Sequence, residues 1–132
     1  MTERQLLQHE IEVRVRYQET DAMGFLHHGN YFTYFEMGRT EMLRFLGHNY
    51  RDLEEAGLLM VVVRIRASYH RPAHYDDVLR LQTTLERVSA AKIEHSYRVF
   101  RGEELLVEGA STLACVNRDG QVQRVPEWMR TE

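Results

Sequence analysis

The sequence lacks several features that would place it in well-known classes of protein. Cys115 is its only cysteine, so no internal disulfide framework can form, and a single thiol agrees with a reducing compartment. No run of uncharged apolar residues is long enough to span a membrane. The first ten residues are polar and lack the apolar segment of a secretory signal, so we expect a cytoplasmic protein.

A basic surplus and the common catalytic motifs are also missing. The chain has 17 basic and 20 acidic residues, a net charge of −3, which argues against nucleic acid as its main ligand. Neither HExxH nor any spaced Cys/His set occurs, so we predict no metal site. There is no Gly-rich phosphate loop and no G-x-S-x-G elbow. Cys115 lies among small apolar residues without a nearby base, which predicts a buried core thiol.

Alternating apolar and polar residues predict about five β-strands, because successive side chains of a strand point to opposite faces. A polar lead-in over residues 1–9 precedes the first of them, and a short helical stretch at 49–56 precedes the second. The predicted strands are 11–17, 58–69, 78–88, 92–100 and 105–117, with 121–125 as a short edge strand and a tail of helical character after Pro126.

One long helix is predicted between the first two strands. Asn30 is a candidate N-cap, and Gly47 stands where a glycine commonly ends a helix. Aromatic and apolar residues recur at three- and four-residue spacing, which places them on one buried face. These residues are Tyr31, Tyr34, Phe35, Gly38, Met42, Phe45 and Leu46.

The order of these elements predicts an α+β fold in which an antiparallel sheet of about five strands curls around one long central helix. The four later strands follow one another like hairpins. A chain of 132 residues fits one domain, residues 1–132. An open sheet leaves edges with unpaired backbone groups. Pairing two copies edge to edge would cover them, so we expect at least a homodimer.

The loop before the helix holds the sharpest chemical signal, an acid close to a helix start. Asp21 could be an ordinary turn residue. However, the first turn of a helix carries unpaired N–H groups with partial positive charge, which can hold a developing oxyanion. An aspartate of ordinary acidity is ionised at neutral pH and can act as base or nucleophile. His28 lies at the expected helix start and could contribute its backbone N–H, or it could be a solvent-facing residue.

These residues carry a family resemblance. The run DAMGFLHHGNY at 21–31, followed by FEMGRTE at 35–41, resembles the 4-hydroxybenzoyl-CoA thioesterase family and, within it, short bacterial acyl-CoA thioesterases. The segment YHRPAHYDD at 69–77 is similar to that family's strand-to-strand connection. The resemblance implies a hotdog fold over nearly the whole chain and hydrolysis of an acyl-CoA thioester.

The resemblance also implies roles for single residues. Asp21 corresponds to the catalytic acid, His28 to the residue whose N–H polarises the thioester carbonyl, and Gly24 to the glycine that lets the loop approach the substrate. Further substrate-binding positions are Tyr31, the sheet residues Val63 and Arg64, and, for the coenzyme A phosphates, Arg87, Ser89 and Lys92. Coenzyme A is part of the substrate, so no separate cofactor is expected.

The family builds its sites between subunits, which implies a dimer or a dimer of dimers, that is, a homotetramer. Two other functions stay open from the sequence: a hotdog hydratase or dehydratase, and a non-catalytic acyl-CoA-binding protein. The acyl group, whether aromatic or of short or medium chain length, is not given by linear patterning.

Overall fold

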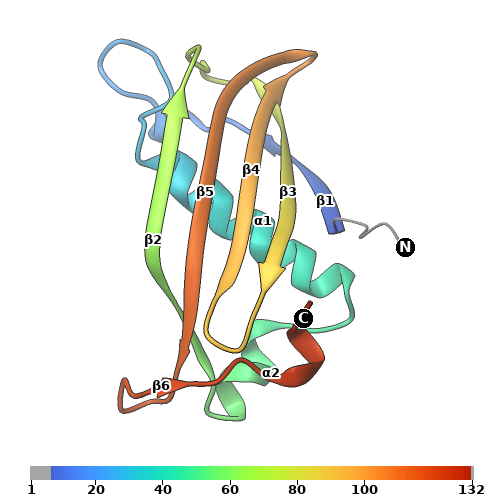
Figure 1. Ribbon diagram of the computed structural model, residues 1–132. Coiled ribbons are helices and arrows are strands. Elements are labelled where there is room, and N and C mark those ends of the chain that lie inside the picture. The colour runs from blue at the N-terminus through green and yellow to red at the C-terminus, as the bar shows by residue number, and fades with distance from the viewer. Residues whose placement is uncertain (1–6, 132) are drawn as a thin grey trace, which may run out of the picture.

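The computed structural model describes residues 7–131. It confirms the α+β prediction: an antiparallel sheet curves over one long helix, α1, which runs along one of its faces (Figure 1). The elements, in chain order, are β1 (Leu7–Arg14), η1 (Tyr17–Glu19), α1 (Asn30–Phe45), α2 (Tyr50–Glu55), β2 (Leu59–Tyr69), β3 (Val78–Val88), β4 (Ile93–Arg101), β5 (Glu104–Val116), β6 (Val122–Gln123) and η2 (Glu127–Met129).

The strand order differs from the predicted succession of hairpins. The sheet runs β1-β3-β4-β5-β2, with β6 paired to β5. Strand β2 therefore pairs with β5, from Leu59 opposite Val116 to Tyr69 opposite Val107, and not with β3. The prediction was wrong here because alternation identifies strands without reporting their neighbours. As a consequence, β1 and β2 form the two edges of the main path, and β2 borders the loop that contains Asp21 (Figure 1).

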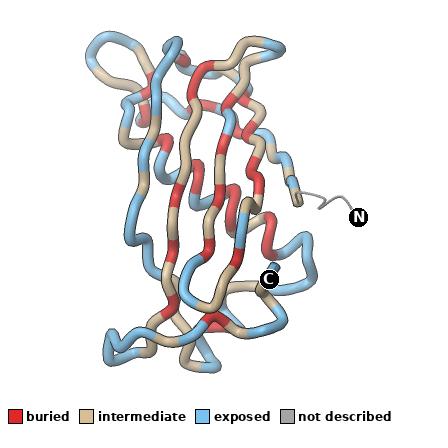
Figure 2. The backbone as a smooth tube through the Cα atoms, in the orientation of Figure 1, coloured by how far each residue is buried: buried red, intermediate tan, exposed pale blue. Residues whose placement is uncertain are grey.

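The core lies between α1 and the concave face of the sheet, where buried positions recur along the central strands (Figure 2). Two glycines allow close packing there. The Phe35 ring stacks on Tyr97 with centroids 4.2 Å apart and passes over Gly109, where an added Cβ would stand 2.5 Å from the ring. Gly38 faces Leu81, whose Cδ2 would be 2.8 Å from an added Cβ. The lack of a side chain at Gly109 and Gly38 thus lets α1 lie close to the sheet.

The ends of two elements depart from prediction. Strand β1 begins at Leu7, so residues 7–9 of the expected polar lead-in belong to the sheet, while 1–6 lie outside the described residues. Tyr17 is exposed in η1 and does not continue the strand. Phe45 and Leu46, which the spacing placed on the buried face of the helix, are exposed at the C-terminal end of α1.

The cysteine prediction is confirmed: Cys115 is fully buried, and burial raises the pKa of its thiol. Among residues 7–131, no helix has the length and apolar character needed to cross a membrane.

Candidate active site

Glu19 fixes the loop that connects η1 to α1. Its carboxylate is 6% exposed and accepts hydrogen bonds from the Tyr34 hydroxyl (2.8 Å) and from the Arg16 N–H (2.8 Å). Its backbone carbonyl accepts from the His27 N–H (2.9 Å) and from Asn30 Nδ2 (2.8 Å). The two ends of the loop are therefore held together at the helix start. Asn30 uses its side chain for this contact, so the predicted N-cap is wrong; Gly29 occupies that position.

The same contacts determine the charge of Glu19. Burial alone would raise the pKa of its carboxyl group, but the hydrogen bonds from Arg16 and Tyr34 outweigh it and lower the pKa below the ordinary value of 4.5. Burial, together with the neighbouring Glu19 carboxylate, raises the pKa of Tyr34. Glu19 is thus ionised and Tyr34 is neutral near neutral pH, which keeps this support of the loop intact.

Asp21 lies in a tight turn that closes with the Gly24 N–H donating to the Asp21 carbonyl at 3.0 Å. Gly24 has φ +82°, a conformation that glycine adopts without steric cost. The Asp21 Oδ1 accepts from the backbone N–H groups of Met23 (2.9 Å) and Phe25 (3.2 Å). Oδ2 accepts from no residue in the described range 7–131. One oxygen therefore orients the carboxylate, and the other is available to a substrate or a water molecule.

His28 supplies the single unused amide at the start of α1. The N–H groups of residues 27 and 29–32 all donate within the protein: to Glu19, to the His27 ring, and to the carbonyls of residues 27–29. The His28 N–H donates to none of the residues 7–131. Its side chain is exposed and stacks on His27, with ring centroids 4.2 Å apart. The position of His28 thus favours a contribution from its main chain.

Asp21 and His28 line one pocket of about 310 Å³. Tyr31 lines it too, and burial raises the pKa of its hydroxyl to about 12. Much of the remaining wall is apolar or aromatic and comes from Phe25, Leu26, Tyr69 and Pro72. The arrangement can place a carbonyl carbon near a carboxylate and the carbonyl oxygen near an amide.

Tyr69 was not singled out from the sequence as a site residue. It ends β2, its hydroxyl donates to the His28 carbonyl at 3.1 Å, and its ring lies 5.5 Å from that of Tyr31. Arg71, beyond it in the chain, lines the same pocket. Both residues belong to the segment 69–77, whose similarity to the family's strand-to-strand connection was the only sequence signal for them. The fold shows in addition that this connection lies beside the start of α1.

The other predicted binding residues do not join this pocket within one chain. Val63 and Arg64 are exposed on the edge strand β2, at a bulge in its pairing with β5. The remaining three, Arg87, Ser89 and Lys92, lie around the β3–β4 turn. At about 3.3 Å per residue along β3, that turn is roughly 30 Å from the Asp21 end of the sheet (Figure 1).

No group of three or more His, Cys, Asp or Glu side chains within residues 7–131 is arranged to hold a metal ion.

Residues 23–108 match the thioesterase superfamily, and the chain belongs to it. The fold is the hotdog fold, and the protein is a thioester hydrolase. The matched span includes His28 and α1 and begins two positions after Asp21.

Relatives and solved structures agree over most of the chain. The chain is 37% identical to the acyl-CoA thioesterase YbgC of Haemophilus influenzae, covering 80% of this chain and 78% of that protein. It is 33% identical to the acyl-CoA thioester hydrolase YbgC of Escherichia coli O6:H1, covering 80% and 79%. The crystal structure of the DHNA-CoA thioesterase from Staphylococcus aureus superposes with a TM-score of 0.88 at 30% identity, covering 92% and 83%.

Proposed function

We propose that this protein hydrolyses acyl-CoA thioesters in the pocket formed by Asp21 and His28. The observation that carries the proposal is the pairing of a carboxylate with a free Oδ2 and the one unused amide of the helix start in the same pocket. The names of the relatives support coenzyme A as the carrier of the acyl group.

In this proposal the thioester oxygen rests against the His28 N–H, where the α1 dipole adds positive potential. Such a donor lowers the barrier by about 3–4 kcal/mol when it is aligned with the oxyanion. Asp21 Oδ2 either attacks the carbonyl carbon or takes a proton from the water that attacks it. The C–S bond then breaks and the sulfur leaves as a thiolate, which is protonated to free coenzyme A. When water attacks, the acyl group leaves directly as the carboxylic acid; when Asp21 attacks, water then hydrolyses the mixed anhydride, which releases the acid and restores the carboxylate.

The aromatic walls bear on the acyl group. Phe25, Tyr31 and Tyr69 give flat apolar surfaces in a pocket of about 310 Å³, which suits an aromatic or short to medium acyl group.

A homodimer through the β2 edge fits the same site. Val61, Val62 and Val63 are exposed along this strand, and an apolar edge strand whose outer side has no neighbour in the sheet invites pairing with a second chain. Antiparallel pairing of two β2 strands reverses the partner's sheet, so the partner's β3–β4 turn would lie toward the Asp21 end. Arg87, Ser89 and Lys92 of a second copy could then approach the coenzyme A phosphates, and such dimers could pair again into a tetramer.

The decisive variant is Asp21→Asn. The amide oxygen of asparagine can keep both hydrogen bonds from the Met23 and Phe25 N–H groups, so the loop should retain its shape. We expect kcat for thiol release to fall at least 100-fold across benzoyl-, butyryl- and octanoyl-CoA. Asp119→Asn, in an exposed turn, is the matched control and should leave the rate unchanged. Wild-type rates in Asp21→Asn would refute the proposal, and addition of water to a 2-enoyl-CoA such as crotonyl-CoA without thiol release would indicate a hydratase.

A further inference from the structure

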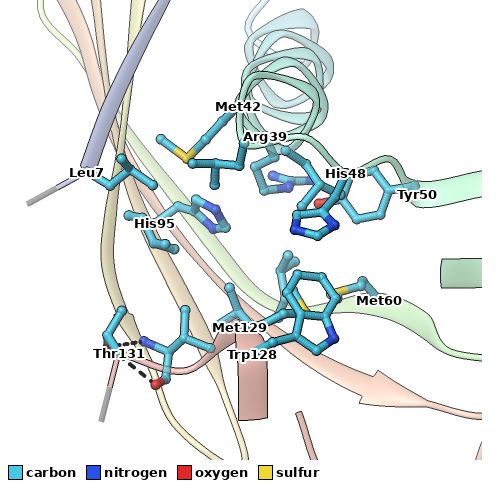
Figure 3. A pocket seen from close by; sticks show the side chains of 16 residues that line it. Leu7, Arg39, Met42, His48, Tyr50, Met60, His95, Trp128, Met129 and Thr131 are labelled. Carbon is cyan, nitrogen blue, oxygen red and sulfur yellow. Dashed lines mark hydrogen bonds between the residues drawn. The ribbon is translucent and has the colours of Figure 1, made fainter. Parts of the chain in front are cut away.

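A second cavity lies at the opposite end of α1, between the helix, the sheet and the C-terminal segment. Its volume is about 330 Å³ and its lining is largely apolar. Figure 3 shows Arg39 and Met42 on its helix side and Trp128 and Met129 across from them. Between Tyr31 and Arg39 the helix rises by roughly 12 Å, so this cavity is separate from the Asp21 pocket of the same chain.

Arg39 brings a buried positive charge to this apolar cavity. The side chain is 7% exposed and forms no ion pair with any of the residues 7–131. Its hydrogen-bond partner there is a neutral hydroxyl group, because Nη1 donates to Tyr97 Oη at 3.0 Å, and Tyr50 lines the same cavity. A guanidinium has five N–H donors, and burial of its charge without an ion-pair partner carries a desolvation cost that an anion would offset. The cavity therefore has a position for an anion.

His95 adds a second unpartnered polar group. It is 7% exposed, lines the same cavity, and its Nδ1 hydrogen-bonds to none of the described residues. Burial, followed by the nearby Arg39 charge, lowers the pKa of His95 to about 3, so the ring is neutral near pH 7 and one nitrogen carries a hydrogen. The ring comes from the sheet and points into the cavity (Figure 3). A neutral N–H and a guanidinium together suit a carboxylate.

The apolar part of the cavity limits the rest of the ligand. Met42, Leu85, Ile93 and Leu113 contribute to its walls. At roughly 30 Å³ for each water-sized group, 330 Å³ holds about ten non-hydrogen atoms, which is the size of an eight-carbon carboxylate. We propose that this cavity binds a free medium-chain carboxylate, with its head group at Arg39 and His95 and its tail among the apolar residues. This site is independent of the proposed hydrolysis at Asp21.

The methyl groups of the methionines can test where octanoate binds, because some of these residues line the cavity and others lie outside it. Met42, Met60 and Met129 line the cavity, whereas Met23 lies in the Asp21 loop and Met37 is exposed on α1. In protein labelled with [methyl-¹³C]methionine, sodium octanoate should shift the first three signals saturably and leave those of Met23 and Met37 unchanged. A shift confined to Met23 would place octanoate in the acyl-CoA pocket and overturn the proposal.

The ligands and variants separate the contributions of charge and tail. Octanol, which lacks the charge, should bind at least about tenfold more weakly than octanoate. Butyrate, shorter by four methylene groups, should bind on the order of 100-fold more weakly. Arg39→Met should abolish the preference for octanoate over octanol, and Arg124→Met, an exposed site with the same charge change, should keep it.

Three outcomes would overturn the proposal: equal affinity for octanoate and octanol, equal shifts with inorganic phosphate, or no shift of the cavity methionines. If Arg39→Met does not fold, the octanoate-to-octanol ratio in the wild-type protein decides. Acyl-CoA hydrolysis, followed separately by thiol release, tests the Asp21 proposal independently of each of these results.

Discussion

The contact between α1 and β3 at Gly38 sets how closely the helix approaches the sheet. An alanine Cβ at this position would overlap Thr83 Oγ1 and stand 2.8 Å from Leu81 Cδ2. Alanine favours a helix over glycine by about 1 kcal/mol. Overpacking a core costs about 1–3 kcal/mol, and because two atoms would stand under 3.0 Å from the new Cβ, the cost here should lie in the upper part of that range, at about 2–3 kcal/mol. We therefore expect Gly38→Ala to lower the free energy of unfolding by about 1–2 kcal/mol.

The Thr83 hydroxyl allows this reasoning to be tested by rescue. Thr83 is buried, and its Oγ1 hydrogen-bonds to no described residue. Thr83→Ala removes an unsatisfied polar group as well as a methyl group, so its own effect should stay within about 1 kcal/mol. In the double variant the new Cβ at Gly38 fills the vacated space. The coupling between the two substitutions should favour the double variant by about 1–2 kcal/mol.

Urea unfolding followed by circular dichroism, at one fixed protein concentration, measures all four proteins of this cycle. Thr33→Ala, on the exposed face of the same helix, should gain a few tenths of a kcal/mol from propensity alone. A Gly38→Ala protein as stable as the wild type, or a double variant no more stable than Gly38→Ala, would refute the packing argument.

Three further predictions concern the active-site loop and the sheet edge. Glu19→Gln should lower the free energy of unfolding by about 1–3 kcal/mol at pH 7. Because folding lowers the pKa of Glu19, this difference should be fully present above about pH 4.5 and should shrink as the pH falls further. Thermal melts at a series of pH values measure it. Tyr69→Phe removes the hydrogen bond to the His28 carbonyl and should reduce kcat/KM for thiol release about three- to tenfold with little change in melting temperature. Val62→Lys puts a charge on the exposed β2 edge, and light scattering should then give half the mass of the wild-type protein.

Control variants and contradicting outcomes can be named for these three predictions. Tyr17→Phe, at an exposed tyrosine, should leave hydrolysis unchanged. A Glu19→Gln deficit that persists unchanged at pH 3 would show that its charge is not the cause. An unaltered mass for Val62→Lys would exclude β2 as the dimer edge, and unchanged turnover in Tyr69→Phe would exclude a positioning role for its hydroxyl.

Local periodicity predicted most of the fold. The alternation in 78–88 gave β3 with the same bounds as the structure, and the spacing from Tyr31 to Met42 gave the buried face of α1. The order of the strands in the sheet could not be predicted from periodicity, because side chains alternate between the two faces of a strand whichever strand pairs with it. The pairing of β2 with β5 depends on contacts between residues some 50 positions apart, such as Leu59 and Val116.

The candidate site was predictable where one short segment carries it and not where distant segments meet. Asp21 and His28 are seven residues apart, and the pattern of the loop located both. Tyr69 reaches the site through a strand edge. Arg39 was missed because a search for an apolar helix face counts an arginine as exposed, although this one is buried against Tyr97.

The burial of Cys115 has a practical consequence. The chain has no other cysteine, and this thiol is enclosed between β-strands and carries a raised pKa, so maleimide reagents should leave the folded protein unmodified. A cysteine introduced at an exposed position such as Met23 would then be the sole point of attachment for a fluorophore. Movements of the loop during turnover could be recorded from that single dye, without first engineering a thiol-free background.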